Sequence, residues 1–383
     1  MDEDELRQLM LAADVPASGA DVRQAIADGR RARGRRMVFS STAAGVAVLA
    51  AVGTFVAFGP MRAGPSGIEP PAAAGGRSAG GPASSCSAAY LEVPAGTTAM
   101  VTAIDPAGNL VGGYLDPQHP GPVRWREGQL LERLPGVTGA VVDIGVDGSV
   151  VGYEANEADE STGWVLIGAQ KIELARLSGY RWTNPSAVNA SGVVAGWVHG
   201  ESLDQSTPVT WSRDGAVHAL RVPAGVGDKD VLSATARGIG DDGTVVGDVH
   251  GVPVVWAPDG TPRALPLPAG SQGGTAWAVA GKYAYGSAGP AAVRWDLIAG
   301  TVTELPRGGD FGARAGTAGG TALLTGDGAD VPAQRVALNG VSDPLTGPRG
   351  EPAMAFAISD DGTTIAGVVV NGGDGRPAVW HCR

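Results

Sequence analysis

The sequence predicts an all-β protein, a seven-bladed β-propeller of four-stranded blades, and three observations support this prediction. The 383 residues include 61 glycines and 27 prolines, yet 43 % of the chain is hydrophobic, which favours many short strands joined by tight turns. One sequence unit recurs seven times between residues 103 and 380. In most copies its third strand ends in tryptophan.

The consensus unit contains an apolar strand, an Asx-Gly turn, a Val-Val-Gly strand, a Val-x-Trp strand and a closing x-x-Leu-Pro, and two copies lack the Asx-Gly turn. The copies are marked by a glycine at the end of the second strand: Gly112, Gly152, Gly196, Gly247, Gly286, Gly326 and Gly367. These glycines are 39 to 51 residues apart. A unit of about 40–50 residues with four short strands is typical of a propeller blade. The fifth and sixth copies are degenerate.

Six of the nine tryptophans occupy the third strand of the unit: Trp125, Trp164, Trp211, Trp256, Trp295 and Trp380. Alternate residues of a strand face the same side, so we expect these indoles to pack between blades rather than to line a cofactor or sugar platform. The Asx-Gly turns, such as Asp241-Asp242-Gly243, lack the ligand spacing of an EF-hand loop. They predict tight hairpins and no calcium site.

The unit resembles that of the bacterial extracellular HAF-repeat family, whose WD40-like propellers pair an Asx-x-x-Gly-x-Val-Val-Gly segment with an apolar strand ending in tryptophan. The best copies read DIGVDGSVVGY at 143–153 and RPAVW at 376–380. The resemblance covers Ala103 to Trp380, with Pro-Val or Ala-Val in place of the family's His-Ala-Phe-like strand. It implies a propeller-like extracytoplasmic domain and no defined activity.

The seventh copy ends at Trp380-His381-Cys382-Arg383, before its fourth strand. Residues 90–96 match the fourth strand at 219–225, so we expect an N-terminal strand, residues 87–95, to pair with 376–381 and to close the ring. Cys86 and Cys382 then both lie at the start of the same hairpin turn, which predicts a disulfide between them. The alternative is two unrelated free thiols.

Residues 37–59 contain no charged side chain and, as a helix, would rise about 34 Å, enough to cross a bilayer. Five arginines lie between residues 30 and 36, which places the N-terminus in the cytoplasm. The sequence therefore predicts a single-pass protein of the cell membrane, with a Pro/Gly/Ala linker at 60–85 and an extracytoplasmic propeller at 86–383. A cleaved signal peptide is the alternative.

Residues 1–36 predict a cytoplasmic tail of short helices, in which seven acidic residues balance seven arginines. This tail is similar to the inner segments of actinobacterial single-span membrane proteins of the anti-sigma-factor type, although it carries no specific motif. The resemblance implies docking of a cytoplasmic protein. The alternative is a solvated tail that only sets the orientation of the chain in the membrane.

The composition excludes several classes of function. A formal net charge of −11 disfavours nucleic acid as a partner, and two cysteines exclude Cys-rich zinc and iron–sulfur sites. The five histidines are dispersed, and nucleophile-elbow, P-loop and dinucleotide-binding motifs are absent. We therefore expect no catalytic residue, metal site or cofactor.

The long, variable connections join strands two and three of a blade, or one blade to the next, on the face predicted to point away from the membrane. Acidic residues gather on these connections: Glu154, Glu157, Asp159, Glu160, Glu201, Asp204, Asp228 and Asp230. They form either a solubilising rim or a ligand-binding patch. The sequence thus predicts a membrane-anchored module that binds a protein or an envelope polymer. A transmembrane regulator and a propeller hydrolase are the alternatives.

Overall fold

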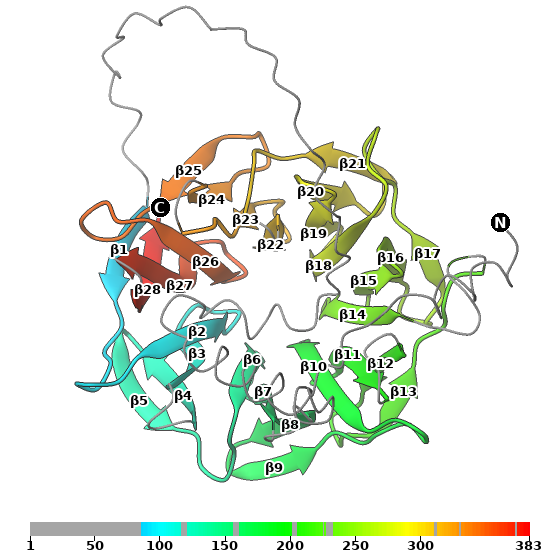
Figure 1. The fold of residues 1–383 in the computed structure, drawn as a ribbon, viewed down its shortest axis with the longest axis horizontal. Coiled ribbons are helices and arrows are strands. Elements are labelled where there is room, and N and C mark those ends of the chain that lie inside the picture. The colour runs from blue at the N-terminus through cyan, green and yellow to red at the C-terminus, as the bar shows by residue number, and fades with distance from the viewer. Residues whose placement is uncertain are drawn as a thin grey trace, which may run out of the picture. The chain divides into compact units, whose positions relative to one another are not determined.

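The computed structural model describes residues 86–115, 121–155, 161–200, 205–224, 226, 233–309, 312–328, 331–371 and 374–383. In these residues, 28 strands form seven four-stranded antiparallel sheets, arranged as the blades of a ring (Figure 1). The predicted all-β, seven-bladed propeller is therefore confirmed. The predicted tail, span and linker, residues 1–85, lie outside the described residues.

The first four blades each contain four strands that follow one another along the chain. Blade 1 contains β2 (Ala99–Ile104), β3 (Leu110–Leu115), β4 (Gly121–Arg126) and β5 (Gln129–Arg133). Blade 2 contains β6 (Ala140–Ile144), β7 (Val150–Ala155), β8 (Ser161–Ile167) and β9 (Gln170–Glu173). Blade 3 contains β10 (Trp182–Val188), β11 (Val194–His199), β12 (Ser206–Trp211) and β13 (Val217–Ala219). Blade 4 contains β14 (Ala234–Ile239), β15 (Val245–Val249), β16 (Val252–Trp256) and β17 (Pro262–Ala264).

Blades 5 and 6 are built in the same way, and only blade 7 takes its outermost strand from another part of the chain. Blade 5 contains β18 (Gly274–Ala280), β19 (Tyr283–Ala288), β20 (Ala291–Asp296) and β21 (Thr301–Glu304). Blade 6 contains β22 (Ala313–Gly316), β23 (Ala322–Leu324), β24 (Ala333–Val336) and β25 (Ser342–Leu345). Blade 7 contains β26 (Ala353–Ile358), β27 (Thr364–Asn371) and β28 (Asp374–Cys382), with β1 (Cys86–Tyr90) as its fourth strand.

The first strand of every blade is the innermost, and each innermost strand contacts that of the next blade (Figure 1). Because the strands of a blade run antiparallel, the ring has two distinct faces. We call the face with the connections between second and third strands, and between blades, the loop face. The face with the connections between first and second, and between third and fourth, strands is the turn face.

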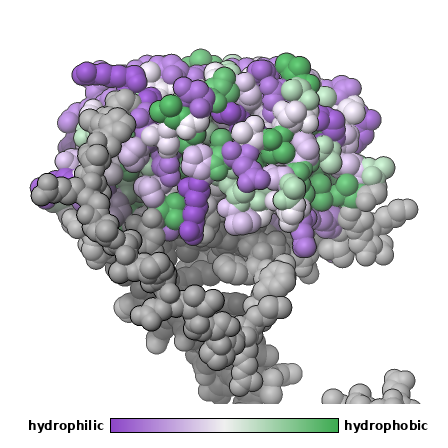
Figure 2. All heavy atoms as spheres, turned by 90° about the horizontal axis from the view of Figure 1, so that it is seen from above, coloured by the Kyte–Doolittle hydropathy of each residue, from purple (hydrophilic) through white to green (hydrophobic). Residues whose placement is uncertain are grey.

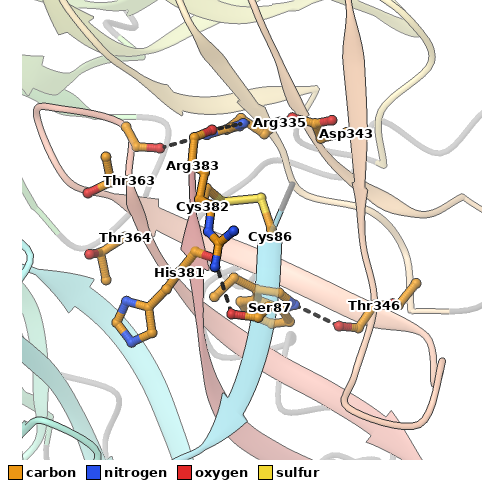
Figure 3. Close-up of a disulfide and its surroundings, with 12 residues drawn as sticks. Cys86, Ser87, Arg335, Asp343, Thr346, Thr363, Thr364, His381, Cys382 and Arg383 are labelled. Atoms are coloured by element: carbon orange, nitrogen blue, oxygen red, sulfur yellow. Dashed lines mark hydrogen bonds and ion pairs between the residues drawn. A yellow bond between two sulfur atoms is a disulfide. The ribbon is translucent and has the colours of Figure 1, made fainter. Parts of the chain in front are cut away.

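The N-terminal strand β1 runs antiparallel to β28, with Cys86 opposite Cys382 and Tyr90 opposite Ala378. A disulfide joins the two cysteines at the turn face, where β28 ends (Figure 3). The Tyr90 hydroxyl donates to Glu351 at 2.9 Å, which ties β1 to the connection between blades 6 and 7 as well. The first and last strands of the propeller thus share one sheet.

The six third-strand tryptophans are confirmed as core residues, each at most 1 % exposed. Each indole N–H also donates, at 2.6–3.3 Å, to a carbonyl just after the outermost strand of the preceding blade. The pairs are Trp125 with Glu92, Trp164 with Thr138, Trp211 with Ala175, Trp256 with Arg221, Trp295 with Pro266 and Trp380 with Thr346. Each indole thus fills the core and hydrogen-bonds the preceding blade.

Blade 6 has Val336 in the position of the tryptophan, so this indole contact is replaced. The fully buried Tyr285 of blade 5 instead donates from its hydroxyl to the carbonyl of Thr317 at 2.5 Å. In this bond the donor belongs to blade 5 and the acceptor to blade 6, whereas each indole donates to the blade that precedes its own. The degenerate sixth copy therefore keeps its connection to the ring through a side chain outside its own repeat.

Every innermost strand carries a β-bulge at the same place, where the pairing register skips one residue: Thr102, Val142, Ser186, Arg237, Trp277, Arg314 and Phe356. A bulge leaves the extra residue unpaired and turns its side chain out of the normal alternation. The seven equivalent positions are therefore free to differ without disturbing the strand pairing.

In six of the seven blades, a glycine of the second strand lies opposite the residue just before the bulge. Gly247 lies opposite Ala236, and a Cβ added to it would be 1.9 Å from the carbonyl oxygen of Thr235. In blade 1 this position belongs to Gly113, one residue after the expected Gly112. In blade 6 it belongs to Leu324, not to the expected Gly326. Strand register, rather than sequence spacing, decides which residue takes this position.

The described part of the chain includes no helix of the length and apolarity that a membrane crossing requires. On the side of the outer edge of the ring that Figure 2 shows, hydrophobic residues are scattered among hydrophilic ones. Among the described residues, the exposed large hydrophobic side chains are spread over blades 1, 2, 5 and 6: Leu131, Val146, Ile298, Leu338 and Val341.

Candidate functional site

The acidic residues predicted as a ligand patch lie outside the described residues: Glu157, Asp159, Glu160, Glu201, Asp204, Asp228 and Asp230. Their role as a binding patch stays a prediction. Glu154, on the same connection face, is described and is engaged within blades 1 and 2. It accepts from the Thr138 hydroxyl at 2.6 Å and pairs with Lys171 at 2.5 Å. Although burial opposes them, these contacts lower the pKa of Glu154.

A different group of side chains stands out at the bulges of the innermost strands. Thr102 and Ser186 use this position to donate a hydrogen bond to the innermost strand of the next blade, at 2.6 Å and 2.7 Å. Three consecutive blades instead carry Arg237, Trp277 and Arg314. Because the bulges are equivalent by the repeat, these three side chains are brought together around the centre of the ring.

The two arginines contact the same indole. The guanidinium carbon of Arg237 is 4.8 Å from the ring centroid of Trp277, and that of Arg314 is 5.0 Å from it. Arg237 also lies over Trp197 of blade 3, at 4.6 Å from the ring centroid. These distances are within the range of cation–π attraction. A continuous chain of contacts thus crosses blades 3 to 6.

The chain of contacts extends towards the loop face through blade 3. His199 follows Trp197 by two residues on β11, so both face the same side of the strand. The His199 ring stacks on Trp182, with centroids 4.7 Å apart and an interplanar angle of 28°. We call this set the aromatic–arginine strip: Trp182, His199, Trp197, Arg237, Trp277 and Arg314.

The strip concentrates positive charge in a domain that is acidic overall. Burial lowers the pKa of Arg237, although Asp248 lies 3.8 Å from its Nε and opposes this shift. Burial likewise raises the pKa of Asp248 despite the attraction of Arg237. Desolvation therefore exceeds the mutual attraction of this pair. Burial and repulsion by Arg237 lower the pKa of Arg314 to about 10, which leaves the Arg314 guanidinium charged at neutral pH.

Several buried polar atoms in and beside the strip have no hydrogen-bond partner among the described residues. They include Nε1 of Trp182, Nε1 of Trp197, Nε of Arg237 and Nδ2 of the neighbouring Asn184. Each of these atoms is a donor. Nδ1 of His199, which can donate or accept, has no partner among the described residues either. Most buried polar groups of a folded protein are paired, so this set of unpaired atoms is informative. An acceptor-rich ligand would satisfy these donors.

The turn-face ends of the innermost strands have the opposite charge. Burial raises the pKa of Asp143 to about 7, against two backbone N–H groups that stabilise its ionised form. Burial also raises the pKa of Asp360, with repulsion from Asp241 and Asp105. Among the described residues, no three His, Cys, Asp or Glu side chains are arranged to hold a metal ion.

The sequence analysis did not identify the strip, although a signal for it was present. When the first strands of the seven copies are aligned, Arg237, Trp277 and Arg314 stand where other copies have threonine, valine, serine or phenylalanine. Such a departure from a repeat marks a position that the scaffold does not require. Its meaning becomes evident only when the three strands lie side by side.

No family model and no curated protein matches the chain. Among solved structures, the chain is similar to selenomethionine-substituted virginiamycin B lyase from Staphylococcus aureus, with a TM-score of 0.52 and 15 % sequence identity. The match covers 78 % of this chain and 99 % of the lyase chain. At this identity the likeness shows the shared propeller fold alone. The resemblance to the HAF-repeat family stays a prediction.

Proposed function

We propose that the chain is a membrane-anchored binding module whose propeller captures a partner, a protein or an envelope polymer, on its loop face. This proposal rests on a difference between two kinds of position in the blades. Some positions hold the same residue type in most blades, and others do not. Tryptophans, glycines and turns repeat because they build the ring. The distinctive side chains of the aromatic–arginine strip and its unpaired donors depart from the repeat, and a rigid scaffold commonly presents recognition groups in this way.

The membrane anchor in this proposal is residues 37–59, with residues 1–36 in the cytoplasm. The position of Cys86 supports the orientation, because the chain reaches the propeller at the turn face. A linker of residues 60–85 would then leave the loop face pointing away from the membrane. The disulfide between Cys86 and Cys382 suits an oxidising compartment outside the cytoplasm.

Ring closure by β1 belongs to the same proposal. A strand placed next to the membrane linker completes blade 7, so tension on the linker would act on a strand that is held by the β28 ladder and by a covalent bond. We propose that this arrangement keeps a tethered propeller closed while its loop face is occupied.

The similar solved structure is called a lyase, and that activity is a property of that protein. Likeness of fold at 15 % identity carries no activity to this chain, because unrelated chemistries share the propeller. The regulator alternative rests on residues 1–36 and has its own test, since a tail that only sets topology should retain no specific cytoplasmic protein. Binding by the loop face is therefore the function that the described residues support best.

The test is co-sedimentation of the purified full-length protein with isolated envelope polymer and with envelope proteins. A variant with Glu157, Asp159 and Glu160 neutralised should lose binding if the acidic rim contributes. A matched control neutralises Glu127, Asp214 and Asp259, which lie in the turns between third and fourth strands, on the turn face. Absence of saturable binding by the wild-type protein to either preparation would contradict the proposal.

A further inference from the structure

We propose that the turn face of blades 5 and 6 docks on the lipid bilayer, with Ile298, Leu338 and Val341 in contact with the headgroup layer. This inference rests on the membrane anchor of the proposed function and assigns a partner to the face opposite the loop face. We call the turn-face connections of these two blades the apolar sector: residues 281–282, 297–300, 317–321 and 337–341.

The apolar sector exposes three large hydrophobic side chains to solvent. Ile298 is 82 % exposed, and Leu338 and Val341 are each more than half exposed. Among the described residues, one further exposed hydrophobic side chain of this size lies on the turn face, that of Val146 in blade 2. Exposed apolar side chains gathered on neighbouring elements mark a surface that contacts another molecule or a membrane.

Hydrogen bonds hold the turns that carry these side chains. The carboxylate of Asp296 accepts from the backbone N–H of Ile298 at 3.1 Å. The buried Arg294 of blade 5 donates to the carbonyls of Gly320 and Leu338 in blade 6, at 2.6 Å and 3.3 Å. The turns of the two blades therefore form one connected surface, which loses little conformational entropy when a partner covers it.

The turn face lacks acidic side chains at the apolar sector. The one charged residue of the sector is Lys282, which pairs with Asp296 of β20 at 3.0 Å. The turn-face connections of the other blades contain nine acidic residues: Asp105, Glu127, Asp147, Asp214, Asp241, Asp242, Asp259, Asp360 and Asp361. Contact with a headgroup layer displaces water, which favours apolar side chains and disfavours carboxylates. The bilayer is therefore favoured at blades 5 and 6 and opposed on the rest of this face.

The chain reaches the propeller beside the apolar sector. Strand β1 begins at Cys86 on the turn face and contacts β25 of blade 6, which begins one residue after Val341. Arg335 of blade 6 donates to the carbonyl of Arg383 at 3.4 Å, next to the disulfide (Figure 3). In the proposed topology, the linker of residues 60–85 has a root-mean-square reach of roughly 28 Å. A tether of this length raises the effective concentration of the bilayer, so weak contacts by three side chains suffice.

Two other occupants of the apolar sector fit the molecule less well. In the proposed topology every copy turns this face to the membrane, so two copies on one bilayer cannot bring their sectors face to face. The linker is a poor occupant because it contains only two large hydrophobic side chains, Met61 and Ile68. The position of the sector next to the tether therefore favours the bilayer.

The experiment places an environment-sensitive fluorophore on one introduced cysteine of the full-length protein in phosphatidylcholine vesicles. Both native cysteines form the disulfide, so the introduced thiol is the one that reacts. Ile298→Cys is the test, and Val146→Cys is the matched control, an exposed turn-face position beside acidic residues. A spin-labelled lipid should quench the label at 298 at least threefold more strongly than the label at 146. Equal quenching would overturn the proposal.

A second substitution tests the neighbouring side chains. In protein labelled at 298, Val341→Asp should reduce the quenching at least twofold, because a carboxylate opposes contact with the headgroup layer. Leu131→Asp, on the outermost strand of blade 1, should leave the quenching unchanged. Leu338→Asp provides an independent variant if Val341→Asp fails to fold. Quenching that neither variant lowers would also contradict docking by the sector.

The same samples separate this inference from the proposed function. Carbonate extraction shows whether residues 37–59 hold the protein in the vesicles. Release by carbonate would reject the anchor, and this inference with it. Retention together with equal quenching at 298 and 146 would reject the docking and leave the anchor standing. Val341→Asp should still co-sediment with envelope material as wild type does, because its loop face is unchanged.

Discussion

Arg237 and Arg314 lie over the same indole ring, that of Trp277, although each of the three residues belongs to a different blade. Their strands do not hydrogen-bond to one another, since each is the innermost strand of its own sheet. The contact exists because the same bulge occurs in consecutive copies of the repeat. The bulge, which all the blades share, thus brings the three side chains into contact. The residue types that depart from the repeat then determine the charge and polarity at this contact.

The disulfide should stabilise the propeller substantially, because it closes a loop with a sequence separation of 296 residues. The chain-entropy model gives about 5 kcal/mol for such a loop, an upper figure in practice. Replacing both Cys86 and Cys382 with serine should therefore lower Tm, and mass spectrometry of a non-reduced digest should show the two peptides joined in the wild-type protein. Two alkylatable thiols in the native protein would contradict the bond.

Gly247→Ala should be severely destabilising, because its Cβ would approach the Thr235 carbonyl oxygen to 1.9 Å. Backbone must move to relieve this contact, so we expect a loss of at least about 3 kcal/mol, or failure to fold. Gly121→Ala is the control, since its Cβ would have no neighbour within 4 Å. Denaturant unfolding measures both. Similar stabilities would show that the close backbone approach in blade 4 does not impose the glycine.

The indole hydrogen bonds between blades can be tested with one pair of tryptophans. Trp256→Phe removes the donor to the Arg221 carbonyl, a bond of 2.6 Å, and should cost about 1–3 kcal/mol. Trp182→Phe should cost less, because the Nε1 of Trp182 has no partner among the described residues. Equal losses in urea unfolding would mean that ring size and packing, rather than the hydrogen bond, account for the repeated tryptophan.

Asp143 should make the propeller less stable as pH rises from about 4 to about 7. Its pKa is raised from 3.8 to about 7, so over this range the folded state keeps a proton that the unfolded state releases. Stability then decreases with pH until the folded carboxyl ionises, by an amount on the order of a few kcal/mol. The measurement is Tm at pH 5 and pH 8, and Asp143→Asn should show a smaller difference.

The control for this pH effect is Asp147, whose hydrogen bond from Ser149 lowers its pKa to about 2. A carboxyl with a lowered pKa stabilises the folded state at pH values above its pKa in the unfolded state. This stabilisation is lost as pH falls from about 4 to about 2. Asp147→Asn should therefore leave the difference between pH 5 and pH 8 unchanged. If Asp143→Asn also leaves it unchanged, the source lies elsewhere, for example in Asp360.

The proposed topology predicts which end of the chain a protease can reach. Protease added to intact cells or spheroplasts should remove the propeller, including Arg383, while residues 1–36 remain protected. An epitope at each end allows both fragments to be followed by immunoblot, and lysed cells provide the control. Protection of the C-terminal epitope in intact cells would rule out an extracytoplasmic propeller.

The sequence alone predicted the number of blades, the four strands of each and the buried third-strand tryptophans. These features could be read because they repeat: a local pattern of Val-Val-Gly, Asx-Gly and Val-x-Trp recurs at the spacing of a blade. Pairing between neighbouring strands in a blade depends on residues close together in the chain, and the alternation of apolar residues reports it directly.

Only the tertiary structure decided which glycine in blade 1 faces the bulge, how blade 6 replaces its tryptophan, and where the ring centre is positively charged. The identity of this glycine depends on strand register. One bulged residue shifts the register, so that Gly113 rather than Gly112 takes the position. Arg237 and Arg314 are 77 positions apart in the chain and meet only because closed packing of the blades brings their innermost strands around one axis. Contacts that span several repeats leave no periodic trace in sequence, and so the candidate site was determined by the fold.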